Sequence, residues 1–311
     1  MWQDTHSLLY TLFWQYTVDT KESEYMRVRF FLFVLLSLAL IACDSGEKSA
    51  AKSESELTSV YERVMTSGKL RCGYILYPPD MMRDPNTQKF SGIFYELTEE
   101  LGRRLSLKVE WAEELTWDTF IAGIKAKRYD MLCSGAWSST AEGREVGYSD
   151  PVFYSQYFPY VRAGDKRFDD DLSKLNNPNV RFSVGDGTMG YLVATSDFPL
   201  AKKLNLPQLS DEGQPIMNVA TGKADVVLQE PYTVALYMKN NPNMLRVLRR
   251  DKPVRVFPNR YVMPLGDVKL QSMINTALEE MQNSGFIDPI IAKHEAFPGS
   301  FLRVVKPYQG K

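Results

Sequence analysis

The sequence predicts an α/β protein of two lobes, each built on a mostly parallel sheet flanked by helices. Short apolar segments alternate with segments whose apolar residues recur every three to four positions, which is the pattern of βαβ units. Residues 43–311 are too many for one small core and fit two domains of ordinary size.

The first half predicts an alternation of strands and helices that begins near Leu57. Its elements in chain order are a strand at 69–75, a helix at 94–105, a strand at 108–111, a helix at 117–126 and a strand at 129–133. The helix at 94–105 is supported by Leu97, Leu101 and Leu105, which lie on one face at helical spacing.

The second half follows the same plan. Its elements are a strand at 180–184, a helix at 188–195, a helix that includes 217–221, a strand at 225–228, a helix at 232–239 and a final helix at 268–282. Pro253, Pro258 and Pro264 break the chain into extended pieces before the final helix. In both halves a strand ends in a loop of small residues that opens a helix, although the sequence itself shows no repeat.

The N-terminal region has the layout of a secretory signal. Arg27 and Arg29 precede the apolar stretch 30–42, which is shorter than the roughly 20 residues of a membrane span. Leu40-Ile41-Ala42-Cys43 resembles a lipobox, so residues 26–42 are predicted to be a lipoprotein signal peptide and Cys43 the lipidated first residue of the mature chain. An uncleaved anchor helix or a buried core helix are the alternatives.

Residues on either side of this signal are predicted to lie outside the fold. Residues 1–25 lack a basic n-region, so we expect translation to start at Met26 and regard 1–25 as a mis-assigned extension. Residues 43–56 are rich in Ser, Lys, Ala and Glu without apolar periodicity, which predicts a flexible tether. The protein is therefore expected outside the cytoplasm, anchored to a membrane.

Composition argues against several classes of function. The formal net charge is −1 with acids and bases interspersed, which argues against a nucleic-acid partner. His294 is the one histidine after Cys43, so a zinc site or a Ser-His-Asp group is difficult to build, and we predict neither metal nor cofactor. Cys72 and Cys133 each end an apolar segment. An oxidising compartment permits a bridge between them, but two buried thiols are preferred because disulfide geometry is restrictive.

The order of short motifs along the chain resembles one family. The blocks are Ser67-Gly68-Lys69-Leu70-Arg71-Cys72-Gly73, Tyr77-Pro78-Pro79, Ser91-Gly92-Ile93-Phe94-Tyr95-Glu96-Leu97, Trp117-Asp118, Lys127-Arg128-Tyr129-Asp130, Ser134-Gly135, Tyr148-Ser149-Asp150-Pro151, Tyr154-Ser155, Gly187-Thr188 and Gly222-Lys223-Ala224-Asp225. Together they resemble the bacterial extracellular solute-binding proteins of family 3, the polar amino acid type, over residues 57–297. Each block alone is a weak signal, and the resemblance rests on their order.

The resemblance implies a two-lobed periplasmic-binding-protein-like fold of type II, whose lobes are joined by two crossover strands and close over a small solute by a hinge motion. Lobe 1 would comprise 57–156 and 259–311, lobe 2 would comprise 157–258, and the hinge strands would lie near 154–162 and 254–263. The resemblance also implies a monomer that delivers its solute to an ABC permease in the inner membrane. Asp44 directly after Cys43 resembles the signal that keeps lipoproteins in that membrane.

In lobe 2 the resemblance places Gly187, Thr188 and Glu230 at the solute. Residues 185–190 spell G-x-G-x-x-G, but they do not follow the first strand of a dinucleotide-binding unit. Thr188 would contact the solute through its hydroxyl or simply open a helix. Glu230 would hold an ammonium group by a charge-assisted hydrogen bond, with Glu in place of the usual Asp. A solvated Glu at a helix start before Pro231 is the alternative.

In lobe 1 the sequence departs from amino acid binders, in which an arginine six residues before the aromatic of the Tyr-Ser block clamps a carboxylate. Counting back from Tyr148 gives Glu142, and the nearest arginine is Arg144. The clamp is therefore either rearranged onto Arg144 or lost. Ser139-Thr140-Ala141-Glu142 has the form of a capping box, which is the structural alternative for Glu142.

The remaining candidates in lobe 1 are small or aromatic. The resemblance places Ser134 and Gly135 at the solute, and Tyr77 and Trp137 would face the cleft and enclose an apolar or cationic part of it. Core packing is the alternative for each aromatic residue. Acids and aromatics together predict a cationic or amine-bearing solute.

The predicted function is capture of a small polar solute, amino acid-like or amine-bearing, for an ABC importer, without catalysis. One alternative is a periplasmic enzyme on the same scaffold that resembles cyclohexadienyl dehydratases, with Glu142 or Glu230 as a general acid of raised pKa. Another is an accessory subunit that senses a solute and reports to a membrane partner.

Overall fold

The computed structural model describes residues 59–169, 171–207 and 213–304. The predicted extension at 1–25, the signal peptide at 26–42, the lipidation site Cys43 and the whole predicted tether at 43–56 lie outside these residues. Among the described residues, none of the helices combines the length and the apolar character that a membrane span requires.

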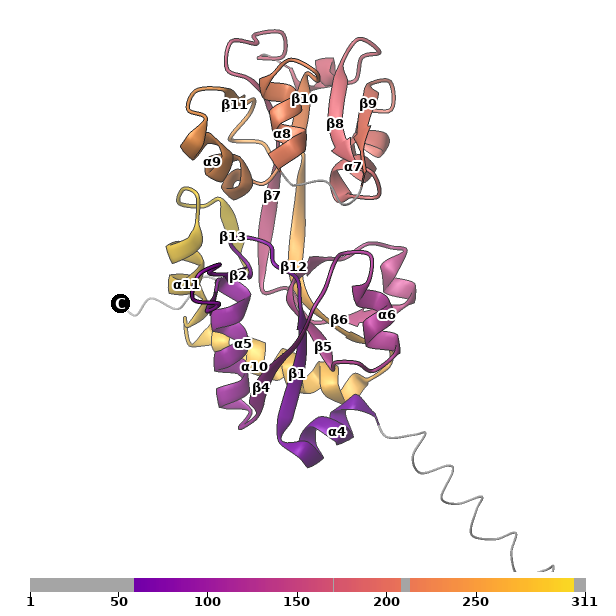
Figure 1. Cartoon of the computed structure of the whole chain (residues 1–311), viewed down its shortest axis with the longest axis vertical. Coiled ribbons are helices and arrows are strands. Elements are labelled where there is room, and N and C mark those ends of the chain that lie inside the picture. Colours follow the sequence, from indigo (N-terminus) through magenta and orange to yellow (C-terminus); the bar gives the residue numbers. More distant parts are fainter. Residues whose placement is uncertain (1–58, 170, 208–212, 305–311) are drawn as a thin grey trace, which may run out of the picture. The chain divides into compact units, whose positions relative to one another are not determined.

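Lobe 1 is built on neighbouring parallel strands in the order β4 (Lys108–Glu114), β1 (Lys69–Tyr74) and β5 (Met131–Trp137) (Figure 1). Its other elements are α4 (Val60–Ser67), the hairpin of β2 (Met82–Arg83) and β3 (Phe90–Ser91), α5 (Ile93–Arg104), α6 (Phe120–Lys125), the single turn η1 (Glu142–Arg144) and β6 (Val146–Tyr148). The predicted alternation of strands and helices in this half is confirmed.

Lobe 2 repeats the arrangement, with β8 (Arg181–Gly185) between the parallel strands β9 (Lys202–Leu206) and β10 (Val226–Gln229). Its other elements are η2 (Leu172–Leu175), α7 (Met189–Asp197), α8 (Gly213–Ala220), α9 (Pro231–Asn240) and β11 (Leu245–Val247). The predicted helix at 188–195 is α7, and Thr188 is its N-cap.

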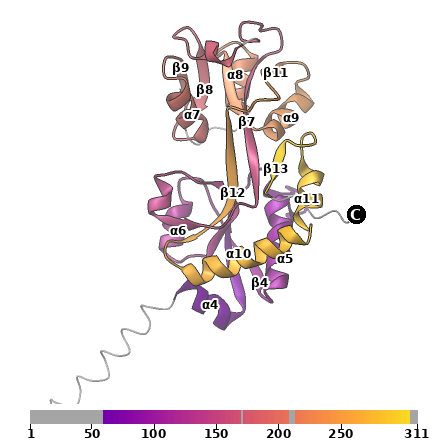
Figure 2. The same ribbon diagram turned by 180° about the vertical axis from the view of Figure 1, so that it is seen from behind.

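Two long strands connect the lobes. They are β7 (Phe153–Arg162) and β12 (Arg255–Pro264), which pair with each other in antiparallel register where the sequence predicts extended segments at 154–162 and 254–263. Figure 2 shows both strands running from one lobe into the other. The full strand path is β4-β1-β5-β12-β7-β10-β8-β9, with β13 (Phe301–Arg303) paired to β7.

Each lobe has its own apolar core. In lobe 1, Leu97 and Leu101 of α5 are fully buried in one cluster with Leu270 and Ile274 of α10 (Val268–Asn283). In lobe 2, Phe182 of β8 belongs to a separate cluster that includes residues of α7 and β10. Burying a leucine or phenylalanine side chain stabilises the fold by about 1.5 to 3 kcal/mol, so each lobe has an independent source of stability. The lobe boundaries at 156/157 and 258/259 remain a prediction.

Cys72 and Cys133 form a disulfide, so the preferred interpretation of two separate thiols is wrong. Their Cα atoms lie 5.4 Å apart on the neighbouring strands β1 and β5, and both residues are fully buried in the lobe 1 core. The pairing of β1 with β5 supplies the separation that a bridge requires. The sequence could not show this separation, because the residues lie 61 positions apart.

In each lobe, an aspartate before one strand accepts hydrogen bonds from an arginine on the neighbouring strand. In lobe 1, the Arg71 backbone N–H donates to the Asp130 carboxylate at 2.6 Å, and the Arg71 Nε donates to it at 3.3 Å. In lobe 2, the Arg181 backbone N–H and Nε each donate to the Asp225 carboxylate at 3.0 Å. Asp130 directly precedes β5 and Asp225 directly precedes β10, so the two halves share this contact at the start of a strand.

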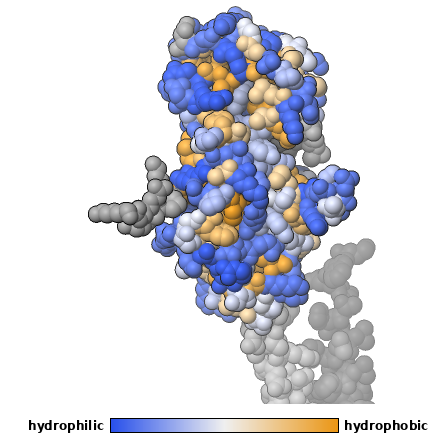
Figure 3. All heavy atoms as spheres, turned by 90° about the vertical axis from the view of Figure 1, so that its left-hand side faces the viewer, coloured by the Kyte–Doolittle hydropathy of each residue, from blue (hydrophilic) through white to orange (hydrophobic). Residues whose placement is uncertain are grey.

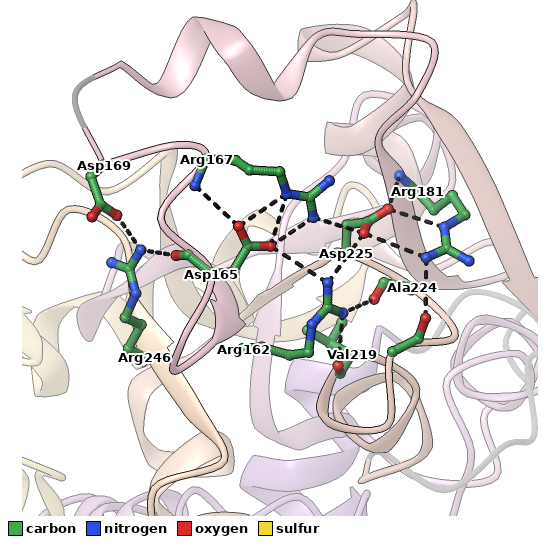
Figure 4. Close-up of polar contacts among 10 residues, drawn as sticks. Arg162, Asp165, Arg167, Asp169, Arg181, Val219, Ala224, Asp225 and Arg246 are labelled. Carbon is green, nitrogen blue, oxygen red and sulfur yellow. Dashed lines mark hydrogen bonds and ion pairs between the residues drawn. The ribbon is translucent and has the colours of Figure 1, made fainter.

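Asp225 also gathers arginines from other parts of lobe 2 (Figure 4). Arg167 Nη2 lies 2.9 Å and Arg162 Nη2 lies 3.4 Å from Asp225 Oδ1, and Asp165 pairs with both arginines. Although burial opposes ionisation, the hydrogen bonds from Arg181 and Arg167 hold the pKa of Asp225 below its ordinary value. The network joins the end of β7 to β8 and β10.

One face of the molecule shows how hydrophilic and apolar residues are distributed. Figure 3 shows the face with α5, α9 and α11 (Ile287–His294) largely covered by hydrophilic residues, with apolar residues in small separate areas. His294 is the last residue of α11, and its Nε2 lies 3.1 Å from Glu96 Oε1.

Candidate functional site

Tyr77 of lobe 1 and Glu230 of lobe 2 meet in the structure. The Tyr77 hydroxyl donates a hydrogen bond of 2.8 Å to Glu230 Oε2. Tyr77 follows the carboxyl end of β1, and Glu230 follows the carboxyl end of β10. Loops after parallel strands are the usual place for ligand contacts in open α/β sheets. Two residues predicted at the solute therefore come together from loops 153 positions apart.

The local sequence directs the Glu230 side chain away from its own helix. Glu230 is the N-cap of α9 in extended conformation, Pro231 begins the helix, and the Glu230 side chain makes no capping bond. Its backbone N–H donates instead to Oε1 of Gln229 at 2.9 Å. Glu230 is 5% exposed, so the alternative of a solvated Glu at a helix start does not describe it.

Asp80 is a second buried acid at this place, and the sequence reasoning did not identify it. Asp80 is 5% exposed, and burial, followed by the nearby Glu230 charge, holds the pKa of its carboxyl well above the ordinary 3.8. The one available signal was a single acid in the otherwise apolar run from Tyr77 to Met82. Burial beside a residue 150 positions away is a tertiary property that this run does not reveal.

The Ser134-Gly135 pair supports the loop that carries Tyr77 and Asp80. The Ser134 hydroxyl accepts from Ile75 N–H at 2.9 Å and donates to the Ile75 carbonyl at 3.0 Å. A Cβ atom on Gly135 would lie 2.7 Å from Asp80 Oδ2 and 2.4 Å from a ring atom of Phe94. Gly135 therefore leaves room for the Asp80 carboxyl, while direct contact of either residue with a solute remains a prediction.

Trp137 packs between the lobes at the connecting strands. Its ring stacks on Phe257 with centroids 4.4 Å apart, meets Tyr157 edge-on at 5.4 Å, and donates from Nε1 to Asn259 Oδ1 at 3.0 Å. Trp137 is the last residue of β5, and its side chain packs against the core cluster of lobe 2. These contacts correspond to the packing alternative, and a role in enclosing the solute stays a prediction.

Thr188 has the geometry of a helix cap. Its hydroxyl donates to the Gly185 carbonyl at 2.8 Å and accepts from the Tyr191 N–H at 3.4 Å at the start of α7. Gly187 has φ = 72°, a left-handed conformation that glycine adopts without a Cβ penalty. Beside them, a Cβ on Gly190 would lie 3.0 Å from the Tyr157 hydroxyl, so α7 begins directly against β7. Contact of Thr188 with a solute is untested.

Glu142 is engaged by its own loop. The Ser139 hydroxyl donates to Glu142 Oε2 at 2.8 Å, the Tyr148 hydroxyl donates to the same oxygen at 3.1 Å, and the Glu142 N–H donates to Ser139 Oγ at 3.2 Å. The bond from the Glu142 N–H to Ser139 Oγ is one half of the predicted capping box, whereas the Glu142 carboxylate accepts from the Ser139 hydroxyl and not from its backbone N–H. Arg144 is exposed on η1, where its charge acts on Glu145. Neither residue is brought to Glu230 by a contact in the structure.

The described residues contain no group of three or more His, Cys, Asp or Glu side chains that could hold a metal ion. The chemistry of the site is therefore carried by two buried carboxyl groups, Asp80 and Glu230, and by tyrosine hydroxyls. Burial raises the pKa of Tyr160 on β7, with Arg250 lowering it and Glu230 adding a smaller increase. Carboxylates surrounded by aromatic rings recognise organic cations through charge-assisted hydrogen bonds and ring faces.

Residues 70–296 match the family model of the bacterial extracellular solute-binding proteins, family 3, and the chain belongs to this family. It is a solute-binding protein with the two-lobed fold of type II periplasmic binding proteins. Membership of an extracellular family implies that the protein works outside the cytoplasm.

Similar proteins agree with this assignment. An L-cystine-binding protein of Bacillus subtilis (strain 168) is 24% identical over 268 residues, which cover 84% of this chain and 94% of the relative. Among solved structures, an ancestral cationic amino acid solute binding protein is 25% identical with a TM-score of 0.60, covering 76% of this chain and 99% of that chain. An ancestral amino acid-binding protein, a precursor of cyclohexadienyl dehydratase, is 24% identical with a TM-score of 0.64 over the same shares and supports the fold.

Proposed function

We propose that this protein captures a small amine-bearing solute outside the cytoplasm and delivers it to an ABC importer. The observation that carries the proposal is the contact between the Tyr77 hydroxyl and the buried Glu230 carboxylate at 2.8 Å. A buried carboxylate costs several kcal/mol unless a donor or a cation compensates it. A protonated amine would add a charge-assisted hydrogen bond to this carboxylate, beside the neutral donor that Tyr77 supplies.

The acid content of the site supports an amine more than a carboxylic acid. Asp80 adds a second carboxyl beside Glu230, and Glu142 occupies the position where the resemblance expects a carboxylate-binding arginine. Arg144 is exposed on η1. The solute is therefore an amino acid whose carboxylate is held in another way, or an amine without a carboxylate.

We further propose that Cys43 is lipidated and holds the binding domain at the inner membrane near its permease. Support comes from the order of Arg27, Arg29, the apolar stretch 30–42 and Cys43. Metabolic labelling with a palmitate analogue tests this. The wild-type protein should carry the label and Cys43→Ser should not, whereas equal labelling of both proteins would contradict lipidation at Cys43.

A thermal-shift screen tests the solute class. A ligand at a hundredfold its dissociation constant stabilises by about 2.7 kcal/mol, which corresponds to a rise in Tm of about 5 to 10 °C for a domain of this size. Amines and amino acids should raise Tm in the wild-type protein, and the rise should shrink in Glu230→Ala. A full response in Glu230→Ala would show that the amine binds elsewhere.

The two alternatives make different predictions. A dehydratase on this scaffold would turn over prephenate or arogenate, and no contact in the described residues favours that reaction over binding. A sensing subunit would bind the same amines without driving their uptake. Uptake of a labelled amine in cells with and without the gene separates the sensor from the importer receptor.

A further inference from the structure

The residues after α11 form a strap that lies along the connecting strand β7. Residues 295–303, the C-terminal strap, end in β13, which pairs with β7 and places Phe301 opposite Ser155. Figure 2 shows β13 beside β7. The Gln156 side chain also donates from Nε2 to the Gly299 carbonyl at 2.6 Å. The strap therefore follows β7 as far as the predicted boundary of lobe 1.

The C-terminal strap is attached to lobe 1. Phe301 is buried in the lobe 1 core cluster, and its ring meets Phe153 edge-on with centroids 5.0 Å apart. Arg303 Nε donates to Asp288 Oδ1 of α11 at 2.6 Å, and Arg303 also pairs with Glu295 at the start of the strap. Both ends of the strap are thus fixed to lobe 1, so we expect the strap to move with that lobe.

An arginine of lobe 2 contacts this strap. The Arg250 Cζ atom lies 4.5 Å from the centroid of the Phe297 ring, within the distance of about 6 Å at which a guanidinium and an aromatic ring attract each other. Arg250 lies in the loop between β11 and β12, two residues after Leu248. Leu248 is buried in the lobe 2 core cluster, and its N–H donates to the Pro159 carbonyl at 3.0 Å. The pair therefore joins the two lobes through side chains, outside the pairing of β7 with β12.

The Arg250–Phe297 pair can respond to hinge motion because its members belong to different lobes. The Arg104–Phe286 pair has the same chemistry, with Cζ 5.6 Å from the ring centroid, but both of its members belong to lobe 1. A rotation of one lobe about β7 and β12 leaves a contact within lobe 1 intact and changes a contact between the lobes. Only contacts that differ between the open and closed arrangements can change the ratio of the two.

We propose that Arg250 and Phe297 form a latch that favours the closed arrangement of the lobes before any solute binds, with the C-terminal strap as its anchor in lobe 1. The inference goes beyond the proposed function, because it concerns the protein without solute. The Tyr77–Glu230 hydrogen bond joins the same two lobes, so the latch is formed in an arrangement in which the candidate site is closed as well. Such a latch raises the affinity for any solute that binds better to the closed form, whatever its chemistry.

The ratio of open to closed molecules in the solute-free protein tests the latch. Spin labels at Asp118→Cys in lobe 1 and Lys223→Cys in lobe 2, in a Cys43→Ser background, report the distance between the lobes by double electron–electron resonance. Both labelled positions are exposed, and Cys72 is bridged to Cys133, so the labels should attach only to the introduced cysteines. Without other substitutions, the doubly labelled protein should show a populated closed distance.

Two substitutions remove the latch from opposite sides. Phe297→Leu keeps an apolar side chain and removes the ring face, so the ratio should shift toward the open form about two- to fivefold, the range that corresponds to one exposed cation–π pair. Arg250→Gln removes the cation and should shift the ratio equally. The double substitution should add nothing further, because either change alone removes the pair. Phe286→Leu is the matched control, and it should keep the ratio of the unsubstituted protein.

Several results would overturn the latch. They are a labelled protein that shows only the open distance, an unchanged ratio in Phe297→Leu and Arg250→Gln, additive shifts in the double variant, or an equal shift in Phe286→Leu. Arg250→Gln changes an exposed side chain, so the test does not depend on how well Phe297→Leu folds. No solute enters the measurement, so a failure of the latch leaves the proposed function intact.

Discussion

Replacement of Glu230 by glutamine isolates the contribution of its charge. The glutamine side chain has the same length and offers an amide oxygen to the Tyr77 hydroxyl, which now donates to Glu230 Oε2 at 2.8 Å. Helix α9 should be unaffected, because the Glu230 side chain makes no capping bond. What disappears is the negative charge that a protonated amine would contact.

The size of the effect follows from the two kinds of hydrogen bond. A bond to a charged partner contributes about 1.5 to 3 kcal/mol and a neutral bond about 0.5 to 1.5 kcal/mol, so the loss is about 1 to 2 kcal/mol. Amine affinity should therefore fall about 5- to 30-fold. In the absence of amine, Tm should change little, because the glutamine oxygen can still accept the hydrogen bond from the Tyr77 hydroxyl.

Isothermal titration with lysine at neutral pH and low salt measures this loss. Glu279→Gln is the control, since Glu279 is exposed on α10 and undergoes the same chemical change. That control should bind like the wild type. If Glu230→Gln also bound lysine with wild-type affinity, the charge of Glu230 would not take part in recognition and the reasoning would fail.

Three further predictions concern stability. Replacing both Cys72 and Cys133 by alanine should lower the free energy of unfolding by about 4 kcal/mol, as expected for a closed loop of 61 residues. A thiol titration of the unreduced wild-type protein that found both of these cysteines free would contradict the bridge. Asp225→Ala should lower the free energy of unfolding in urea by about 1.5 to 3 kcal/mol, because charged hydrogen bonds from partly exposed arginines are lost. Since the folded-state pKa of Asp225 is lowered, this stabilisation should disappear as pH falls through that pKa, and a constant difference down to strongly acidic pH would contradict it. Burial and then the Glu230 charge raise the pKa of Asp80, so its carboxyl favours the fold below the ordinary 3.8 and this contribution is lost as pH rises through the folded value. Asp80→Asn should therefore raise Tm more at pH 7 than near pH 4, and equal shifts would argue against a raised pKa.

Elements set by local periodicity could be predicted from the sequence. The helix predicted at 94–105 is α5 at Ile93–Arg104, and the extended segments at 154–162 and 254–263 are β7 and β12. Amphipathic spacing and proline placement act over short stretches, so one sequence contains the signal. The predicted ends of strands and helices differ from the observed ends where small or polar residues occur. β5 continues to Trp137 because the small residues after Cys133 are buried, and α6 begins only at Phe120 after a turn closed by the Thr116 and Thr119 hydroxyls.

The site was predicted in part, because its members are far apart in sequence. Tyr77 and Glu230 were identified separately through the resemblance, and the structure joins them by one hydrogen bond. Asp80 was missed because its burial depends on Gly135 and Glu230, which no local pattern connects to it. The prediction of two separate thiols was wrong for the same reason, because the distance between Cys72 and Cys133 cannot be read from their positions in the sequence. The Tyr77–Glu230 contact, the burial of Asp80 and the disulfide all depend on residues far apart in the chain. Local patterns in a single sequence do not show which distant residues come together.

The most direct test of the account is one calorimetric comparison on the wild-type protein at pH 7. Putrescine and succinate have four-carbon chains with opposite charges at both ends, so they differ in the property that the Asp80 and Glu230 site is proposed to recognise. Putrescine should bind with measurable heat and a single site per chain, and succinate should give none. Binding of succinate without binding of putrescine would contradict the central claim that this cleft captures amines.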